Sequence, residues 1–182
     1  MLIKKSLKNL MLIFLVIIYS CERDQPVFGE NGMVVSTSSQ ASQVGIDIMK
    51  AGGNAIDAAA AVGFALAVTS SSNGNIGGGG FMTVKLENGN SFTLDYREMA
   101  PKAASRNMYL DREGNVIKGK SRYTHFAAGV PGSVDGLLKA WRDYGSGNIS
   151  REQLLDPAIN LAENGFKPVS YTHLRAHETL TD

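Results

Sequence analysis

A run of glycines followed by a short hairpin pattern places the strictest limits on how this chain can fold. Residues 77–80 are all glycine, and two runs of alternating apolar residues then flank the pair Asn88-Gly89. Asn-Gly between such runs is a strong hairpin signal, because a type I′ turn needs positive φ at both central residues. The stretch therefore predicts an antiparallel hairpin that begins where the glycines end.

One face of this hairpin should be apolar and the other polar, because successive side chains of a strand point to opposite sides. The apolar face carries Met82, Val84, Leu86, Phe92, Leu94 and Tyr96. Thr93, Asp95 and Arg97 share the polar face of the second strand. Arg97 thus leaves a strand whose other face is buried, which suits a side chain that must hold an anion in a fixed geometry.

The glycine run (residues 77–80) has two interpretations: a loop that contacts a ligand, or a turn where two backbones approach closely. A phosphate-binding loop needs a strand before the glycines and a helix after them. Here a helical pattern precedes the glycines and a strand pattern follows, and no Gly-Lys-Ser/Thr ending is present. The order excludes a nucleotide loop and favours close backbone approach over direct ligand contact.

Residues 1–20 have the pattern of an export signal rather than of a folded segment. Lys4, Lys5 and Lys8 precede an apolar run at residues 10–19. That composition is typical of a signal peptide, and the run is too short for a comfortable membrane-spanning helix. We therefore expect an exported bacterial protein on the periplasmic or cell-surface side.

The signal ends in Ile18-Tyr19-Ser20-Cys21, which resembles the bacterial lipobox, where the cysteine is lipidated and becomes the mature N-terminus. Cys21 is the only cysteine, so a disulfide within the chain is impossible. We expect lipidation of Cys21, a tether at residues 21–31, and attachment to a membrane through the lipid. An ordinary signal peptide that ends by chance at a cysteine is the alternative.

Two helices are predicted before the glycine run. The first spans Ser39 to Lys50, after which Gly52 and Gly53 end it. The second spans Ala55 to Val68 and is apolar nearly all round, which is typical of a buried helix. Asn54 can cap it, and Asp57 in its first turn is expected to interact with the helix dipole or the cap rather than act as a catalytic acid. A short strand is predicted at residues 33–36.

After Arg97 the pattern predicts a second hairpin and two more helices. The hairpin covers residues 108–117 and turns at residues 111–115. An amphipathic helix opens at Ser133 and ends at Gly145, with an apolar stripe made of Val134, Leu137, Leu138, Trp141 and Tyr144. Ser150 and Gln153 form a capping box for a last helix, which Pro157 should interrupt.

Composition narrows the function classes. The net charge is +1, and no basic stripe with interleaved aromatic residues is present, so nothing indicates nucleic-acid binding. His125 lies outside any serine or cysteine constellation and is expected to be a structural residue. No cofactor is indicated.

Four segments carry a resemblance to a known family. They are GGNAIDAAAA (52–61), ALAVTSSSNGNIGGGGFM (65–82), LDYREMAPKAASRNMYLD (94–111) and AAGVPGSVDGL (127–137). In their order and in their residues they are similar to the γ-glutamyltransferases, also called γ-glutamyl transpeptidases or glutathione hydrolases. Residues 32–168 resemble the N-terminal part of the large subunit of that family.

The resemblance implies an α+β protein with the αββα sandwich of N-terminal-nucleophile hydrolases. In that family a precursor cleaves itself, and the new N-terminal threonine of the small subunit attacks a γ-glutamyl amide such as glutathione. The γ-glutamyl group then passes to water or to an amino acid. The resemblance also implies that Arg97 binds the α-carboxylate of the γ-glutamyl group; a structural salt bridge with Asp95 or Glu98 is the alternative.

This chain ends before the family's threonine would appear, so no catalytic residue is assigned in it. We expect an incomplete sandwich that is inactive alone and whose hairpin lacks neighbouring strands, with its apolar faces exposed. For the full-length protein two other interpretations stay open. One is a related acylase or capsule-processing enzyme, and the other is a non-enzymatic surface lipoprotein on the same scaffold.

Residues 169–182 break the family pattern. The string VSYTHLRAHET resembles one reading frame of a transposon sequencing adapter, and we interpret the tail as not native. His173 and His177 stand four apart with Glu178 beside them, a spacing typical of a metal site on a helix. Because the tail is interpreted as adapter sequence, we expect no metal site.

Overall fold

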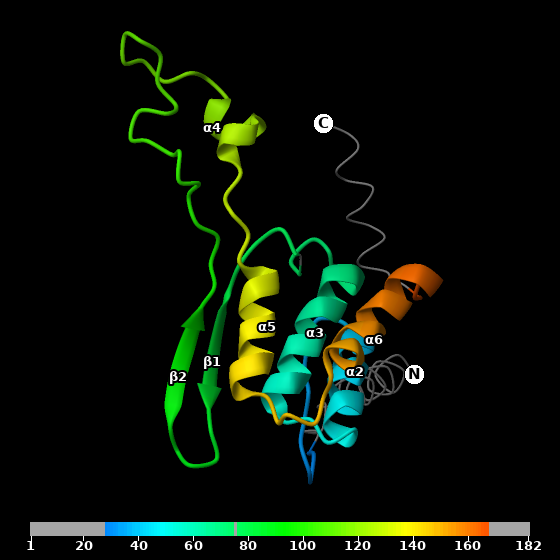
Figure 1. Cartoon of the computed structure of the whole chain (residues 1–182). Coiled ribbons are helices and arrows are strands. Elements are labelled where there is room, and N and C mark those ends of the chain that lie inside the picture. Colours follow the sequence, from blue (N-terminus) through cyan, green and yellow to red (C-terminus); the bar gives the residue numbers. More distant parts are fainter. Residues whose placement is uncertain (1–27, 75, 168–182) are drawn as a thin grey trace, which may run out of the picture. The chain divides into compact units, whose positions relative to one another are not determined.

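The structure of the chain is a computed structural model that describes residues 28–74 and 76–167 (Figure 1). The predicted signal peptide, Cys21, most of the tether and the tail at residues 169–182 lie outside the described residues. Among the described residues, those from Gly32 onward form one compact unit. No helix among the described residues is long and apolar enough to cross a membrane.

The two helices predicted before the glycine run are confirmed. They are α2 (Ser39–Lys50) and α3 (Ala55–Thr69). Helix α3 is the centre of the core: α2, α5 and α6 all pack against it. Its small side chains allow this, and Ala60, Ala61 and Ala65 are completely buried.

The start of α3 explains why an acidic residue sits in an apolar helix. The side chain of Asn54 accepts hydrogen bonds from the backbone of Ile56 and Asp57, and Asp57 Oδ2 accepts one from the Asn54 amide at 2.8 Å. Asp57 is fully buried. The predicted role of Asp57 in the cap is therefore confirmed.

The last two helices begin where the sequence predicts. They are α5 (Ser133–Tyr144) and α6 (Arg151–Asn164), the latter opened by the capping box of Ser150 and Gln153. The expected interruption at Pro157 is wrong, because α6 continues through it. Proline removes a single backbone N–H, and Leu154 and Ala158 on either side are buried in the core, which holds the helix together. Val134 also departs from its predicted stripe, since it is exposed.

The predicted hairpin is present as β1 (Phe81–Lys85) and β2 (Ser91–Asp95), which pair antiparallel. Met82 lies opposite Leu94 and Val84 opposite Phe92, so the apolar face is as predicted. On the other face the hydroxyls of Thr83 and Thr93 are 3.3 Å apart.

The turn of this hairpin is not the predicted type I′. Leu86 N–H donates to the Asn90 carbonyl at 2.8 Å, and Gly89 N–H donates to the Leu86 carbonyl at 3.0 Å. Gly89 has φ +86°, whereas no non-glycine residue in the described ranges has positive φ. The loop therefore has three residues, a turn closed by a left-handed glycine, in which Asn88 needs no unusual φ.

Helices cover the apolar face of the hairpin, so the expectation that this face would be exposed is wrong. Val84 is buried with Ile56 of α3 and Ala140 of α5, and the rings of Phe92 and Tyr144 lie 4.3 Å apart between centroids. Figure 1 shows the hairpin beside α5, with α3 beyond it. Within the described residues the sheet has two strands, and the strand predicted at residues 33–36 does not form. Val34 packs against the helical core instead.

Between β2 and α5 the chain makes a long excursion, which we call the arm (residues 100–129). Met99 and Val130 close its base by exchanging two backbone hydrogen bonds, of 3.1 and 2.8 Å. The second predicted hairpin is present, but its two sides are joined by only one antiparallel bridge, between Leu110 and Val116. The arm then contains α4 (Lys120–Tyr123) and the 3-10 helix η1 (His125–Ala127). Most of its side chains are exposed, His125 among them.

Candidate functional site

Arg97 leaves the end of β2 on the open face of the hairpin, as the alternation predicts. Its guanidinium carbon lies 5.8 Å from the centroid of the Phe81 ring, and Phe81 is paired with Asp95 on that face. The arginine side chain is exposed, and only its backbone N–H bonds to Asp95, at 3.0 Å from Oδ1. Among the described residues the guanidinium forms no ion pair with Asp95 or Glu98. The structure thus does not contain the salt bridge that was the alternative for Arg97.

The glycine run fixes the backbone on one side of Arg97. Gly80 and Tyr96 exchange backbone hydrogen bonds of 3.0 and 3.4 Å, which extend the hairpin pairing. A Cβ on Gly79 would lie 2.6 Å from the Arg97 Cα and 2.5 Å from the Glu98 nitrogen. Real Cβ atoms do not approach other atoms so closely. The predicted role of these glycines, a close approach of two backbones, is confirmed.

The first turn of α5 fixes the other side. The amides of Gly132 and Ser133 donate to the Gly78 carbonyl at 2.8 and 3.1 Å, so the glycine run also caps this helix. A Cβ on Gly132 would overlap the Tyr96 carbonyl oxygen, and one on Gly136 would overlap the Tyr96 ring. Strand end, glycine run and helix therefore meet around Tyr96 and Arg97.

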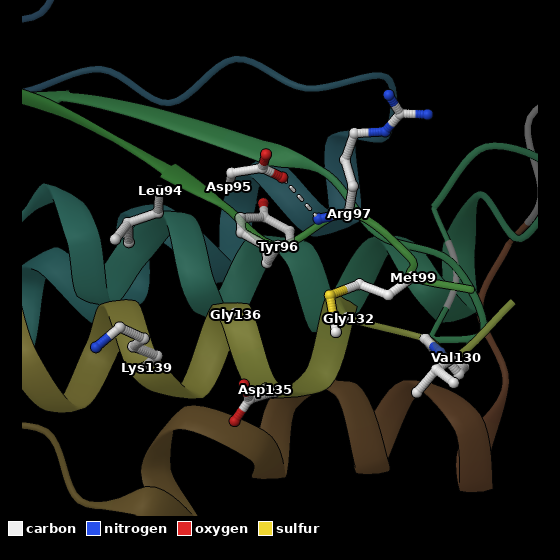
Figure 2. A pocket seen from close by; sticks show the side chains of 11 residues that line it. Leu94, Asp95, Tyr96, Arg97, Met99, Val130, Gly132, Asp135, Gly136 and Lys139 are labelled. Carbon is white, nitrogen blue, oxygen red and sulfur yellow. Dashed lines mark hydrogen bonds between the residues drawn. The ribbon is translucent and has the colours of Figure 1, made fainter. Parts of the chain in front are cut away.

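A pocket of about 320 Å³ lies between the end of β2 and α5. Its lining includes Tyr96, Met99, Val130, Gly132, Asp135 and Lys139. Figure 2 shows the guanidinium of Arg97 pointing away from α5 and from the side chains of Asp135 and Lys139. The guanidinium thus faces the open side of the hairpin rather than the interior of this pocket.

Burial and ion pairing shift the pKa values of three side chains in or near the pocket. Burial raises the pKa of the Tyr96 hydroxyl above its ordinary value. A hydrogen bond of 2.5 Å to Asp143 raises the pKa of Lys139, and the same contact lowers the pKa of Asp143. In the part of the chain that the structure describes, no group of three or more His, Cys, Asp or Glu side chains is placed to hold a metal. His173 and His177 lie outside that part.

The site as built can bind an oxyanion. An arginine presents five N–H donors in a planar fork that matches a carboxylate, and here the fork is exposed while its backbone is held on both sides. Sequence reasoning found Arg97 and the glycine run but missed Gly132 and Gly136. Their spacing, one helical turn apart at the start of an amphipathic helix, was the available signal.

The sequence of the chain is similar to that of a known family. The family model described as gamma-glutamyltranspeptidase matches residues 41–181. A glutathione hydrolase proenzyme of Pseudomonas sp. (strain A14) is 57% identical over 141 residues, covering 78% of this chain and 24% of the relative. The glutathione hydrolase proenzyme of Escherichia coli (strain K12) is 49% identical over 150 residues, covering 81% and 26%. The chain spans about a quarter of the length of these relatives.

Solved structures match as well. The γ-glutamyltranspeptidase of Helicobacter pylori has a TM-score of 0.78 at 44% identity, covering 85% of this chain and 44% of that one. The transpeptidase CapD of Bacillus anthracis gives 0.62 at 30% identity, covering 84% and 44%. A cephalosporin acylase from Bacillus halodurans gives 0.70 at 28%, covering 88% and 30%. These likenesses confirm the expected α+β class and the N-terminal-nucleophile hydrolase fold, of which this chain carries a part.

Proposed function

Because the chain belongs to the γ-glutamyltranspeptidase family, we propose that the full-length protein cleaves γ-glutamyl amides such as glutathione and passes the γ-glutamyl group to water or an amino acid. The observation that carries this is Arg97, whose guanidinium has no ion-pair partner among the described residues while its backbone is tightly packed. The names of the relatives, glutathione hydrolase proenzymes, support the substrate class.

The proposed role of Arg97 is to bind the α-carboxylate of the γ-glutamyl group. Two parallel N–H···O bonds fix both the position and the orientation of a carboxylate. The scissile amide lies at the other end of the glutamyl side chain, so a fixed α-carboxylate places that amide at a fixed distance. Arg97 therefore orients the substrate, and the reacting atoms are supplied from elsewhere in the full-length protein.

The covalent step in this proposal belongs to a threonine at the N-terminus of the small subunit, which this chain does not contain. The threonine oxygen attacks the γ-carbonyl carbon, its proton passes through the threonine's own α-amine to the leaving amine, and an ester with the γ-glutamyl group forms. Water or an amino-acid amine then attacks the ester and regenerates the hydroxyl. The partner of residues 32–168 is accordingly the small subunit of the same precursor.

The test uses the full-length protein and two substrates. One is a chromogenic γ-glutamyl anilide, and the other is the 4-aminobutyryl anilide, which lacks only the α-carboxylate. Wild type should self-cleave and prefer the first substrate, while Arg97→Lys should self-cleave normally and lose about 10- to 100-fold of the preference, as expected for a bidentate charged contact. Arg106→Lys, a change at an exposed arginine of the arm, is the control. A preference that survives Arg97→Lys would contradict the proposed role.

A related acylase or capsule-processing activity is the second candidate. It is supported by the likeness to CapD and to the cephalosporin acylase, at 30% and 28% identity, against 57% for the glutathione hydrolase proenzyme of Pseudomonas. Both candidates require self-cleavage, so a full-length protein that never cleaves itself would indicate a non-enzymatic member of the family. Turnover of an acyl amide without an α-carboxylate, at a rate that exceeds γ-glutamyl turnover, would favour the acylase.

The same proposal includes export and anchoring. The basic residues and apolar run of residues 1–20, followed by the lone Cys21, support a lipid-modified N-terminus on the periplasmic or cell-surface side. A γ-glutamyl enzyme placed there would act on exported substrates.

A further inference from the structure

We propose that Gly79, Gly132 and Gly136, which we call the glycine clamp, are positioning residues that set the direction in which Arg97 presents its guanidinium. The inference rests on the proposed function of Arg97. It assigns to these glycines a role in substrate recognition, in addition to packing.

The first half of the clamp is Gly79. The atoms nearest to its absent Cβ include the Arg97 Cα and the Glu98 nitrogen, at 2.6 and 2.5 Å. Both are backbone atoms, which cannot rotate away as the end of a flexible side chain can. Any side chain at position 79 must therefore push the end of β2, and Arg97 with it.

The second half consists of Gly132, which precedes α5, and Gly136 in its first turns. A Cβ on Gly132 would overlap the Tyr96 carbonyl oxygen and lie 3.1 Å from the Arg97 carbonyl oxygen. One turn later, the atoms nearest to a Cβ on Gly136 all belong to the Tyr96 side chain. Residues four apart share a face of a helix, so the two glycines form a flat surface for Tyr96. Residues 96–98 are thus held between a loop on one side and a helix on the other.

This matters because nothing else among the described residues holds the arginine head group. Its side chain forms no ion pair there, and its one aromatic neighbour, Phe81, lies at 5.8 Å and is itself 58% exposed. The position of the Arg97 Cα and the direction of its Cα–Cβ bond therefore set the region that the guanidinium can reach. A displacement of about 1 Å in a substrate-positioning group can cost about 100-fold in rate.

A purely structural role predicts something different. If the three glycines only allow close packing, a substitution lowers stability and changes kcat/KM for both anilide substrates by the same factor. If they position Arg97, the substitution specifically lowers the preference for the substrate that carries an α-carboxylate, and the loss depends on the arginine being present.

The experiment is a double-mutant cycle in the full-length protein. Gly79→Ala is combined with Arg97→Met, and the ratio of kcat/KM for the γ-glutamyl and 4-aminobutyryl anilides is measured for each variant. We expect Gly79→Ala to lower the ratio about tenfold or more when Arg97 is present and to leave it unchanged in the Arg97→Met background. Gly89→Ala is the matched control. It introduces strain at φ +86° in the same hairpin with no atom within 4 Å of its Cβ, and should not change the ratio.

The outcomes separate the two proposals. If Arg97→Met lowers the ratio and Gly79→Ala does not, the clamp is overturned while the role of Arg97 stands. If Arg97→Met leaves the ratio unchanged, the proposed role of Arg97 fails, and the clamp with it. Should Gly79→Ala fail to fold, Tyr96→Leu provides the same test from the helix side, because it removes the ring that packs against Gly136 without adding an atom that clashes.

Discussion

The backbone amide of Ser146 donates a 2.9 Å hydrogen bond to Oδ2 of Asp57, although the two residues are 89 positions apart in the sequence. The Asn54 amide donates to the same oxygen at 2.8 Å. One buried carboxylate thus joins the start of α3 to the connection between α5 and α6. The other oxygen, Oδ1, is buried without a hydrogen-bond partner in the described part of the chain.

Removing this carboxylate should destabilise the protein more than most single changes. Asp57→Ala leaves two backbone N–H groups without their acceptor, and hydrogen bonds to charged groups contribute about 1.5–3 kcal/mol each. We expect the free energy of unfolding, measured by urea denaturation of the full-length protein, to fall by about 3 kcal/mol. Asp57→Asn keeps one oxygen and should lose less. Asp143→Ala, a change at a carboxylate that pairs only on the surface, should have no resolvable effect, and an equal loss there would contradict this account.

Gly45 should resist replacement although it lies inside a helix. Glycine to alanine in a helix normally gains about 1 kcal/mol. Here a Cβ would lie 2.7 Å from Val62 Cγ2 and 2.9 Å from Val34 Cγ1, and valine side chains are stiff. We expect Gly45→Ala to lower the melting temperature and Val62→Ala to restore part of the loss in the double variant. A Gly45→Ala protein more stable than wild type would show that α2 and α3 can separate freely.

The burial of Tyr96 should make the protein less stable at strongly alkaline pH. Burial raises the pKa of this hydroxyl in the folded state, so folding favours the protonated form. The contribution is fully present below the unfolded pKa of about 10 and is lost as the pH rises through the higher folded value. The free energy of unfolding of wild type, relative to that of Tyr96→Phe, should therefore be constant from pH 7 to 9 and fall above pH 10. A difference that does not vary with pH would contradict the assignment.

Cys21 should carry the lipid anchor. Full-length protein expressed in a bacterium should partition into the detergent phase, and mass spectrometry of its N-terminal peptide should show acyl groups on Cys21. Cys21→Ala should move the protein to the aqueous phase without changing its turnover. Soluble wild-type protein with an unmodified cysteine would mean that residues 1–20 are an ordinary signal peptide.

The sequence predicted the features that depend on neighbours in the chain. Helix α2 has the bounds that were expected, because glycines end it and its apolar spacing is regular. The capping boxes at Asn54 and Ser150 are local motifs, and both are present. The two faces of the hairpin follow from alternation alone, which is why Arg97 could be placed on its open side.

The features that depend on distant contacts were not predictable. Asn-Gly occurs in both two-residue and three-residue hairpin loops. Here the pairing of Leu86 with Asn90 gives the three-residue loop. Pro157 is tolerated because of the core packed around α6. The glycine clamp joins Gly79 to Glu98 and Gly132 to Tyr96. The spacing of Gly132 and Gly136 marks the two glycines as a pair, but nothing in a single sequence identifies Tyr96 as the residue that they contact.

The bridge between Met99 and Val130 has a consequence for how this chain can change over evolutionary time. Because the arm enters and leaves the fold at one pair of hydrogen-bonded residues, its two ends stay together whatever lies between them. Insertions or deletions within residues 100–129 therefore need not alter the register of β2 or the first turn of α5. Between the family-like segments at residues 94–111 and 127–137, residues 112–126 can therefore vary in length while Arg97, a few residues before the base of the arm, keeps its place.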